Sequence, residues 1–315
     1  MNRRIKVGVV GVGSLGQHHA RIYAAMPEAE LVGVYDADQD RAAKIAKSHR
    51  VTAFPSIEAL ADVVEALSIV VPTDKHHEVA KLLIAKGRHL LVEKPITATT
   101  AEAEDLVQLS QAKGVILQVG HIERFNPVLG YLDQIAHNPR FIEAHRLAPY
   151  PPPRDGLPPR GTEVSVVLDL MIHDLEIILH LVKSPVKDIR AVGVPVLSPT
   201  EDIANVRLLF ENGCVANVTA SRISPEKLRK IRVFLSDAYV SLDYQDQAGE
   251  IYRLVQGKIT RDKVPIEKGE PLAHELRSFV RCVHDRDNPV VSAEHAAEAL
   301  KLAVAITQRI REGAS

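Results

Sequence analysis

Three residues of this 315-residue chain combine a reactive side chain with a setting suited to proton transfer. Lys94, in a Glu-Lys-Pro tripeptide, follows the apolar run 90–92, so it is expected where a buried strand ends. Asp169 and His173 stand four positions apart in an otherwise apolar segment, and a helix places residues at this spacing on one face. A carboxylate orients a nearby imidazole and stabilises its charged form, and histidine titrates near neutral pH. Taken singly, Lys94 also fits a solvated loop, and the other two fit a helix cap and a core histidine.

A glycine-rich turn near the N-terminus predicts a dinucleotide site. Gly11, Gly13 and Gly16 form the pattern G-x-G-x-x-G between a strand expected at 6–10 and a helix that opens near Ser14. The first glycine permits a tight turn, the second lets the backbone approach a pyrophosphate, and the third lets the helix pack on the strand. Free N–H groups at the start of the helix then face the phosphates.

Asp36 ends the next expected strand, about 20 residues after the last glycine, where such sites carry their ribose-binding acid. Its carboxylate accepts hydrogen bonds from the adenosine ribose and repels a 2′-phosphate, so we predict NAD rather than NADP as the cofactor. Arg41 is a candidate contact for a 2′-phosphate or for the adenine. The alternative, a solvated residue on a helix, is at least as good an interpretation.

Residues 72–76 end another expected strand, at the edge of the sheet where the nicotinamide half of the cofactor arrives. Pro72 ends strand pairing, and Thr73 binds the ligand or caps the following helix. One of His76 and His77 is a candidate cofactor contact, although a surface helix is the commoner place for either. The predicted cofactor-binding residues are Gly11, Gly13, Ser14, Leu15, Gly16, Asp36, Arg41, Pro72, Thr73, His76, Glu93 and Lys94.

The first 120 residues alternate short β-branched runs with longer helical stretches, which predicts an α/β fold with a doubly wound parallel sheet. After Gly120 the pattern changes, and a proline-rich loop at 149–153 precedes a helix at 163–182. The strands expected in the first half are 6–10, 30–35, a weak 51–53, 66–71, 89–92 and 115–119, with helices such as 37–49, 76–86 and 101–113.

Alternating runs in the second half predict an open, mostly antiparallel sheet with helices on one face. Asn212-Gly213 is a strong hairpin signal between two of these runs. We therefore predict an NAD-binding Rossmann domain at 1–121 and an α+β domain for substrate binding and oligomerisation at 122–315. The expected strands are 189–196, 204–210, 214–221, 230–235 and 239–244, and two helices, 271–286 and 292–312, close the chain.

Composition excludes several classes of partner. A net charge of -1 offers no global field for nucleic acid or an anionic membrane, and no segment has the apolar length of a membrane helix. Cys214 and Cys282 lie far apart without a nearby cysteine partner, which argues against disulfides and zinc. None of the 14 histidines stands at a convincing metal-ligand spacing, so no metal is predicted. We expect a cytoplasmic protein with free thiols.

The order of these motifs is similar to that of a known family. The glycine turn, Pro-Thr-x-x-His at 72–76, Glu-Lys-Pro at 93–95, and then Asp169 with His173 resemble the glucose-fructose oxidoreductase, inositol dehydrogenase and rhizopine catabolism (GFO/IDH/MocA) family over nearly the whole chain. The resemblance implies a Rossmann domain, an α+β domain whose open sheet often forms the oligomer contact, and an NAD(P) cofactor beside a Lys/Asp/His trio. By position, Lys94, Asp169 and His173 take the three places.

The implied reaction is the oxidation of an alcohol, in which the hydroxyl proton is removed as a hydride leaves the adjacent carbon for nicotinamide. We expect His173 to be the general base, Lys94 to hold the hydroxyl oxygen and stabilise its negative charge, and Asp169 to orient the pair. Lys94 is the base instead if burial lowers its pKa far enough, and the sequence leaves both assignments open.

Three longer motifs narrow the resemblance. Residues 120–127, 167–174 and 220–225 are similar to the branch that oxidises the 3-hydroxyl of UDP-N-acetylglucosamine, before a PLP-dependent aminotransferase installs the 3-amino group of certain lipid A molecules. A UDP-sugar needs cationic partners for its diphosphate, and a guanidinium fork suits phosphate oxygens. The predicted substrate-binding residues are Lys94, Arg124, Asn126, Asp169, His173 and Arg222.

Two other interpretations compete with this one. A dehydrogenase of a free sugar or inositol shares the trio and needs no uridine or diphosphate contact. A non-catalytic dinucleotide-sensing regulator keeps the Rossmann domain and is expected to have lost the trio, whereas all three members are present here. An open sheet with an uncovered apolar face favours a homo-oligomer, and a dimer and a tetramer both fit.

Overall fold

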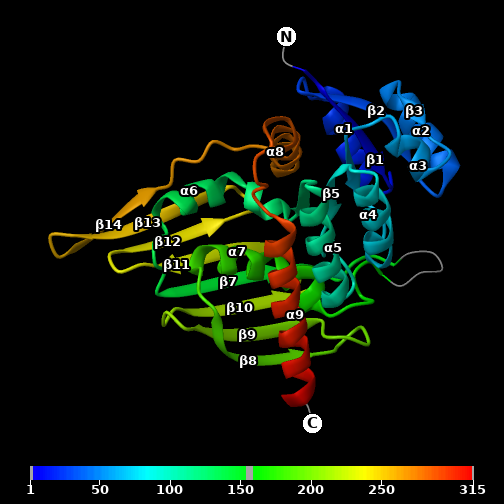
Figure 1. Ribbon diagram of the computed structural model, residues 1–315. Coiled ribbons are helices and arrows are strands. Elements are labelled where there is room, and N and C mark those ends of the chain that lie inside the picture. The colour runs from blue at the N-terminus through cyan, green and yellow to red at the C-terminus, as the bar shows by residue number, and fades with distance from the viewer. Residues whose placement is uncertain (1–2, 154–158, 314–315) are drawn as a thin grey trace. The chain divides into compact units, whose positions relative to one another are not determined.

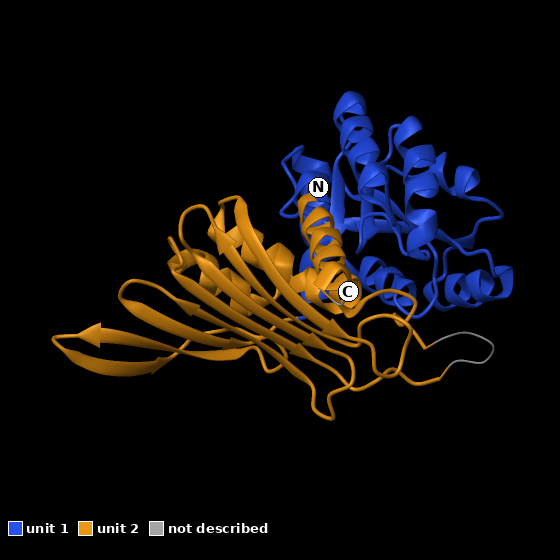
Figure 2. Ribbon diagram, turned by 90° about the horizontal axis from the view of Figure 1, so that it is seen from below, with its two compact units in different colours: residues 1–122, 270–297 blue, residues 123–269, 298–315 orange. Residues whose placement is uncertain are grey.

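The computed structural model describes residues 3–153 and 159–313 (Figure 1). The chain divides into two compact units, which we call unit 1 (residues 1–122 and 270–297) and unit 2 (residues 123–269 and 298–315) (Figure 2). The first boundary lies close to the predicted one, but the segment 270–297 returns to unit 1. It does so because apolar residues of α8 (Pro271–Asp285), among them Leu276 and Phe279, are buried in the same cluster as β1 (Ile5–Val10).

Unit 1 contains the predicted doubly wound parallel sheet. Its six strands are all parallel and lie in the order β3-β2-β1-β4-β5-β6. The central strands are buried on both faces, as expected for a sheet covered by helices on both sides. The strands are β1, β2 (Ala29–Tyr35), β3 (Thr52–Ala53), β4 (Ala66–Ile69), β5 (His89–Glu93) and β6 (Leu117–Gly120). The helical segments are α1 (Gly16–Ala25), α2 (Gln39–His49), α3 (Ile57–Ala61), η1 (Thr73–Lys75), α4 (His76–Ala85), α5 (Thr100–Lys113) and α8.

Local signals set the ends of these helices. At the start of α5, the Thr99 hydroxyl accepts the Glu102 N–H at 3.3 Å, and the Glu102 carboxylate accepts the Thr99 N–H at 3.0 Å. The helix ends at Gly114, which has a φ of 61°. Asp38 caps α2 in a similar way, since its carboxylate accepts the Arg41 N–H at 3.0 Å.

Unit 2 is built on an eight-stranded sheet in the order β14-β13-β12-β11-β7-β10-β9-β8. All neighbours are antiparallel except β7 and β10, which are parallel, so the predicted mostly antiparallel sheet is confirmed. The turn at Gly213, with a φ of +84°, joins β9 to β10 as expected. The strands are β7 (Phe141–Leu147), β8 (Val186–Val194), β9 (Ile203–Phe210), β10 (Val215–Ser221), β11 (Leu228–Phe234), β12 (Ala238–Asp243), β13 (Ala248–Val255) and β14 (Lys258–Lys263).

Helices lie against one face of this sheet (Figures 1 and 2). They are α6 (Pro127–Ile135), η3 (Val167–Met171), α7 (Ile172–Val182) and the part of α9 (Ala293–Gly313) that belongs to unit 2; the short η2 (Ile122–Phe125) precedes α6. Residues on this face alternate with those on the opposite face, so Val206, Leu208 and Phe210 of β9 are buried while Asn205 and Arg207 are exposed. We call the opposite face, which no described helix of unit 2 covers, the open face.

Three strands of unit 2 lie outside the sequence prediction, and each lacks a clear apolar alternation. All six residues of β14 are exposed, so nothing in that segment signals burial. In β7, Arg146 occupies one of the inward positions and interrupts the apolar pattern. Of the helices within residues 3–153 and 159–313, none has the length and apolar composition needed to cross a membrane.

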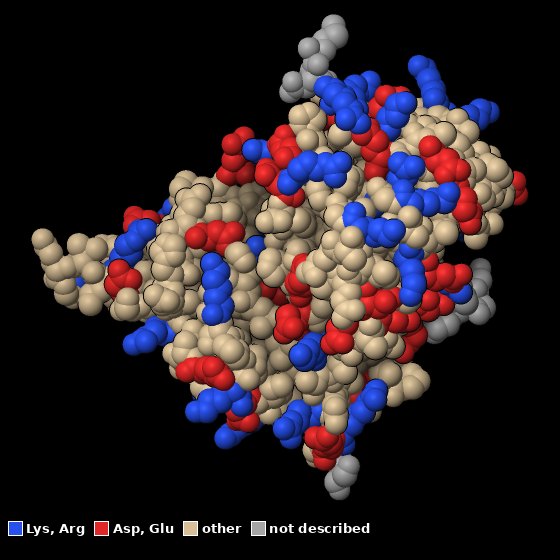
Figure 3. Space-filling model, in the orientation of Figure 1, with Lys and Arg blue, Asp and Glu red and all other residues tan. Residues whose placement is uncertain are grey.

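Basic and acidic side chains are interspersed over the visible surface of both units (Figure 3). This distribution agrees with the balance of 39 Lys and Arg against 40 Asp and Glu in the chain.

Candidate active site

The glycine turn after β1 has room for a ligand at one of its three glycines. A Cβ at Gly16 would overlap the carbonyl of Gly11, and a Cβ at Gly11, whose φ is +86°, would overlap the carbonyl of Val70. The protein itself therefore requires these two glycines. At Gly13 the nearest atom to an added Cβ is Nη1 of Arg41, 3.9 Å away. The space beside Gly13 thus fits the close approach of a pyrophosphate, as the sequence predicted.

Asp36 is buried behind this turn, at the end of β2. Its Oδ2 accepts the Val12 N–H at 2.8 Å, and its Oδ1 accepts the Asp38 N–H at 2.9 Å. Arg41 donates from Nη1 to Oδ1 of Asp36 at 3.2 Å and from Nη2 to Asp38 at 2.9 Å. Asp36 therefore ties β2 to the glycine turn, and Arg41 forms ion pairs with both acids instead of being a fully solvated helix residue.

His76 links the ends of two neighbouring strands. Its Nδ1 lies 2.9 Å from the carbonyl of Pro95, and its Nε2 lies 2.9 Å from the carbonyl of Val71. Burial lowers the pKa of His76, and a neutral imidazole donates its single N–H to one of these carbonyls at a time. His76 thus connects two backbone segments next to Lys94. His77 instead lies 2.7 Å from Asp105 on the neighbouring helix.

Lys94 directly follows the last residue of β5 and is half-buried, which places it at the carboxyl edge of the parallel sheet. Pro72 and Thr73 follow β4 at the same edge, at the start of η1. The edge where these residues lie is the one at which doubly wound sheets bind their ligands.

Behind this edge, Glu93, one of the predicted cofactor contacts, lies with two buried ionisable side chains that sequence reasoning missed, His19 and Glu275. Glu93 accepts a hydrogen bond from Nε2 of His19 at 3.1 Å, and the His19 side chain is fully buried. Glu275 of α8 is fully buried, and neither of its carboxyl oxygens has a hydrogen-bond partner in the described part of the chain. The position of His19, three residues after the last glycine of the turn, is a sequence signal that could have pointed to it.

In unit 2, Asp169 and His173 lie on consecutive helical turns. Asp169 is in the π-helical turn η3, where the Ile172 N–H donates to the carbonyl of Val167 five residues back. His173 is in the first turn of α7, and both side chains are half-buried. The predicted pair is therefore present in one helical segment, and π turns occur frequently at functional sites.

A buried ion-pair network fixes the start of α7. Asp174 accepts two hydrogen bonds from Arg146 of β7, at 2.7 and 3.1 Å. Arg146 also donates to Glu123 at 2.9 Å, and Arg229 donates to the same carboxylate at 3.3 Å. Burial alone would lower the pKa of Arg146, but Asp174 and Glu123 outweigh burial and raise it, so the guanidinium stays charged. The neighbour of His173 is thus fixed to the sheet.

Two of the predicted substrate contacts have internal partners in this region. Arg124 donates to Glu176 at 2.7 Å, and both side chains are almost completely buried. Asn126 caps α6 and donates to the carbonyl of Tyr244 at 3.0 Å.

Arg222, the third predicted substrate contact, is 2 % exposed. Its Nε donates to Asp202 at 2.8 Å and its Nη1 donates to the carbonyls of Gly161 and Val164, at 2.6 and 2.9 Å. Its Nη2 donates to the hydroxyls of Ser198 and Thr200, at 2.8 and 2.9 Å. These bonds use all five N–H donors of the guanidinium, so contact with a phosphate would require Arg222 to give one of them up.

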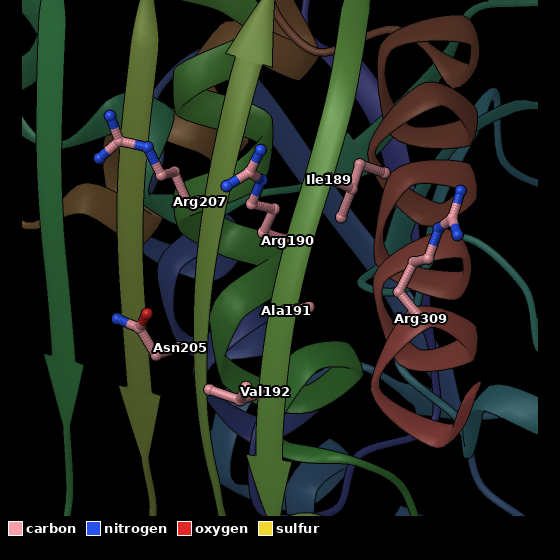
Figure 4. A pocket seen from close by; sticks show the side chains of 7 residues that line it. All are labelled: Ile189, Arg190, Ala191, Val192, Asn205, Arg207 and Arg309. Atoms are coloured by element: carbon pink, nitrogen blue, oxygen red, sulfur yellow. The ribbon is translucent and has the colours of Figure 1, made fainter. Parts of the chain in front are cut away.

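The described residues contain no group of three or more His, Cys, Asp or Glu side chains arranged to hold a metal ion. A pocket of about 380 Å³ lies at the edge of the sheet of unit 2, and none of its lining residues is a predicted site residue (Figure 4). Arg190 and Arg207 lie side by side there on β8 and β9, and Arg309 of α9 also lines the pocket.

The doubly wound sheet and the glycine turn define the class of protein, an NAD-binding oxidoreductase with a second, α+β unit. Comparison with protein families agrees: residues 5–121 match the family described as oxidoreductase family, NAD-binding Rossmann fold, and residues 138–241 match the GFO/IDH/MocA C-terminal domain. The chain belongs to the GFO/IDH/MocA oxidoreductase family, as its motifs predicted.

Several relatives are similar over most of their length. UDP-N-acetylglucosamine 3-dehydrogenase from Acidithiobacillus ferrooxidans is 40% identical over 286 residues, which cover 89% of this chain and 88% of the relative. A solved structure of the enzyme from that organism matches with a TM-score of 0.92 and 36% identity, over 98% of this chain and 99% of that one. The NAD(+)-dependent scyllo-inositol 2-dehydrogenase of Bacillus subtilis is 26% identical, over 99% of this chain and 96% of the relative.

Proposed function

We propose that this protein oxidises the 3-hydroxyl of UDP-N-acetylglucosamine to the 3-keto nucleotide sugar, with NAD as the cofactor. The observation that carries the proposal is the 40% identity to an enzyme named for this reaction, which extends over 89% of the chain. A ketone at this position is the substrate that a PLP-dependent aminotransferase needs to make a 3-amino sugar. The proposed pathway is therefore the synthesis of a lipid A that contains such a sugar, in the cytoplasm.

The proposed mechanism divides the chemistry among three side chains. NAD, when bound, supplies the acceptor for the hydride that leaves carbon 3 of the sugar. His173 removes the hydroxyl proton, Lys94 holds the hydroxyl oxygen and stabilises the charge that develops on it, and Asp169 orients this pair. Lys94 belongs to unit 1 and the other two belong to unit 2, so the proposal requires the three to meet around one substrate carbon.

Asp36 supports NAD over NADP as the cofactor. Its carboxylate is buried at the end of β2 and has Val12 and Asp38 as backbone donors, which keep it in place beside the glycine turn. A fixed carboxylate at this position accepts ribose hydroxyls and repels a 2′-phosphate. Arg41, paired with Asp36 and Asp38, is already neutralised by two acids and is a poor partner for that phosphate.

A homo-oligomer formed through the open face is the second part of the proposal. Val192 and Val194 of β8 lie on this face with exposed fractions of 66% and 52%. The aromatic rings of Phe234, Tyr239 and Tyr252 form a continuous row across β11, β12 and β13 on the same face. Apolar patches of this kind mark interaction sites, and a second copy of the chain offers a self-complementary partner.

The experiment that tests the function is a comparison of UDP-sugars, free sugars and inositols as substrates. The purified protein is incubated with NAD and each compound, and formation of reduced nicotinamide is followed. We expect turnover with UDP-N-acetylglucosamine, and more product when an aminotransferase consumes the ketone. Lys94→Ala and His173→Ala should each lose at least about 100-fold in kcat while the Kd for NAD stays near the wild-type value. Turnover of inositol or free N-acetylglucosamine in preference to the nucleotide sugar would contradict the proposal.

A further inference from the structure

Gly161 lies directly against the carboxylate of Asp169. Its φ is +82°, which side chains rarely adopt, and a Cβ at this position would overlap Oδ2 of Asp169. The contact is therefore between backbone and carboxylate, and only glycine allows the carboxylate to occupy its observed position. No other residue type at this position preserves both the turn and the location of the acid.

Arg222 fixes the segment that carries Gly161. Two of its five hydrogen bonds go to backbone carbonyls of residues 161 and 164, at 2.6 and 2.9 Å. Its Nε is bound to Asp202, whose carboxylate also accepts the backbone N–H groups of residues 196–198, so the guanidinium is anchored in a second loop. Although burial raises the pKa of Asp202, hydrogen bonds from the Ser198 hydroxyl, from Arg222 and from the backbone N–H groups of residues 196 and 197 lower it well below its usual range.

The second loop also contacts the first directly. The Thr200 hydroxyl donates to the carbonyl of Val164 at 2.9 Å and accepts Nη2 of Arg222 at 2.9 Å. Arg222, Thr200 and Asp202 thus hold the backbone at 161–164, and the Asp169 carboxylate lies against Gly161 of this segment. The chain of contacts runs without interruption from Asp202 to the carboxylate of Asp169.

We propose that Arg222 and Gly161 are positioning residues, which set the location of the Asp169 carboxylate relative to His173. This inference rests on the proposed function, because it assigns Asp169 the task of orienting the catalytic pair. If Arg222 is a positioning residue, its replacement lowers kcat. The sequence instead predicts that Arg222 contacts the substrate, where its partner would be the diphosphate. The two roles differ in the kinetic parameter that each controls.

The first test uses a pair of matched glycine variants. Gly161→Ala and Gly213→Ala place the same methyl group at nearly the same φ, +82° and +84°, but an added Cβ at Gly213 has no atom within 4 Å. Both variants carry the backbone strain, and only Gly161→Ala displaces Asp169. Since a misplacement of about 1 Å can cost about 100-fold in rate, we expect kcat to fall about 10- to 100-fold in Gly161→Ala and to stay near wild type in Gly213→Ala.

A second measurement separates this inference from the proposed function. The pKa of His173 is followed by NMR in the protein without cofactor or substrate, with His173→Gln to assign the signal. A nearby carboxylate stabilises the imidazolium, so its displacement in Gly161→Ala should lower the pKa of His173 relative to Gly213→Ala. Equal pKa values and equal kcat in the two variants would overturn the inference, whatever the substrate. Wild-type turnover of Asp169→Asn would instead contradict the proposed role of Asp169.

Arg222→Lys distinguishes positioning from substrate binding. Lysine keeps the charge but cannot make the five hydrogen bonds, so a positioning role predicts a loss mainly in kcat, with the same shift of the His173 pKa. A rise mainly in KM for the UDP-sugar, with kcat and the His173 pKa unchanged, would refute the positioning role and support a phosphate contact.

Discussion

At the scale of single residues, Glu275 is an exception to the rule that a buried acid is hydrogen-bonded or ion-paired. The acids of unit 2 that are comparably buried, such as Asp174 and Glu123, accept hydrogen bonds from arginine. Glu275 has no such partner in the described part of the chain, and burial raises its pKa well above 4.5, with a further contribution from the charge of Glu93. The folded protein therefore keeps a proton on Glu275 that the unfolded chain releases.

The sign of the resulting pH dependence follows from this difference. Above about pH 4.5 the folded state binds one more proton than the unfolded state, so the free energy of unfolding decreases as the pH rises. Glutamine at this position cannot titrate and does not lose this stability. We expect Glu275→Gln to gain stability over the wild type as the pH rises from about 4.5 towards the folded-state pKa of Glu275, at up to about 1.4 kcal/mol per pH unit.

Denaturation of both proteins at about pH 5 and about pH 8 checks the prediction. Glu267→Gln makes the same change of charge at an exposed position and serves as the control. A difference in unfolding free energy between Glu275→Gln and the wild type that stays constant with pH would show that Glu275 is ionised in the folded state.

Residue types alone could reveal only part of the site. Lys94, Asp169 and His173 stood out because reactive groups are unusual after a buried strand or within an apolar helix. The internal hydrogen bonds of Arg124, Asn126 and Arg222 could not be predicted in the same way, because their acceptors, among them Glu176 and Asp202, lie far away in the sequence. A motif shows that an arginine is present but not which hydrogen bonds it has already made.

At the scale of elements, the three glycines of the glycine turn differ in whether the fold or the ligand requires them. Gly11 and Gly16 are required by contacts within the protein, while the space beside Gly13 is open. Gly13→Ala should therefore leave the thermal midpoint nearly unchanged and weaken NAD binding at least about tenfold, because the methyl group occupies the space of the pyrophosphate.

Gly114→Ala is the opposite case and serves as the control. Gly114 ends α5 at a φ of +61° with no atom near an added Cβ, so alanine there should cost about 1 kcal/mol of stability and leave NAD binding unchanged. Calorimetric titration with NAD and thermal denaturation measure both quantities. Wild-type NAD affinity in Gly13→Ala would show that the cofactor does not approach the turn at this position.

The elements themselves were predictable where the sequence pattern and the burial pattern coincide. The apolar strands of unit 1 and the hairpin at Asn212-Gly213 are of this kind. The strand β14 was not, because its residues are all exposed, and it pairs with β13 through backbone hydrogen bonds and exposed contacts such as the Arg253–Asp262 ion pair, which leave no apolar pattern. The helix α8 was predicted, but its return to unit 1 was not, because an amphipathic pattern does not specify which core the apolar face joins.

At the scale of the whole molecule, the open face predicts the behaviour of the protein in solution. Val192→Asp combined with Val194→Asp places charge in the proposed contact and should shift the protein from an oligomer towards a monomer. Val63→Asp, at a position in unit 1 that is 45% exposed, is the matched control and should leave the mass unchanged. Light scattering during size-exclusion chromatography gives the mass of each variant. A monomeric wild type, or a double variant with the wild-type mass, would rule out this face as the contact.

In the proposed reaction a hydride leaves carbon 3 of the UDP-sugar for NAD while His173, held in place with Lys94 and Asp169, removes the hydroxyl proton. The most direct measurement uses UDP-N-acetylglucosamine that carries deuterium at carbon 3, with NAD and the wild-type protein. Mass spectrometry of the reduced nicotinamide should find the deuterium transferred to it, and the sugar product should have lost it. Reduced nicotinamide without deuterium, or no reduction at all in the presence of a ketone-consuming aminotransferase, would contradict the account.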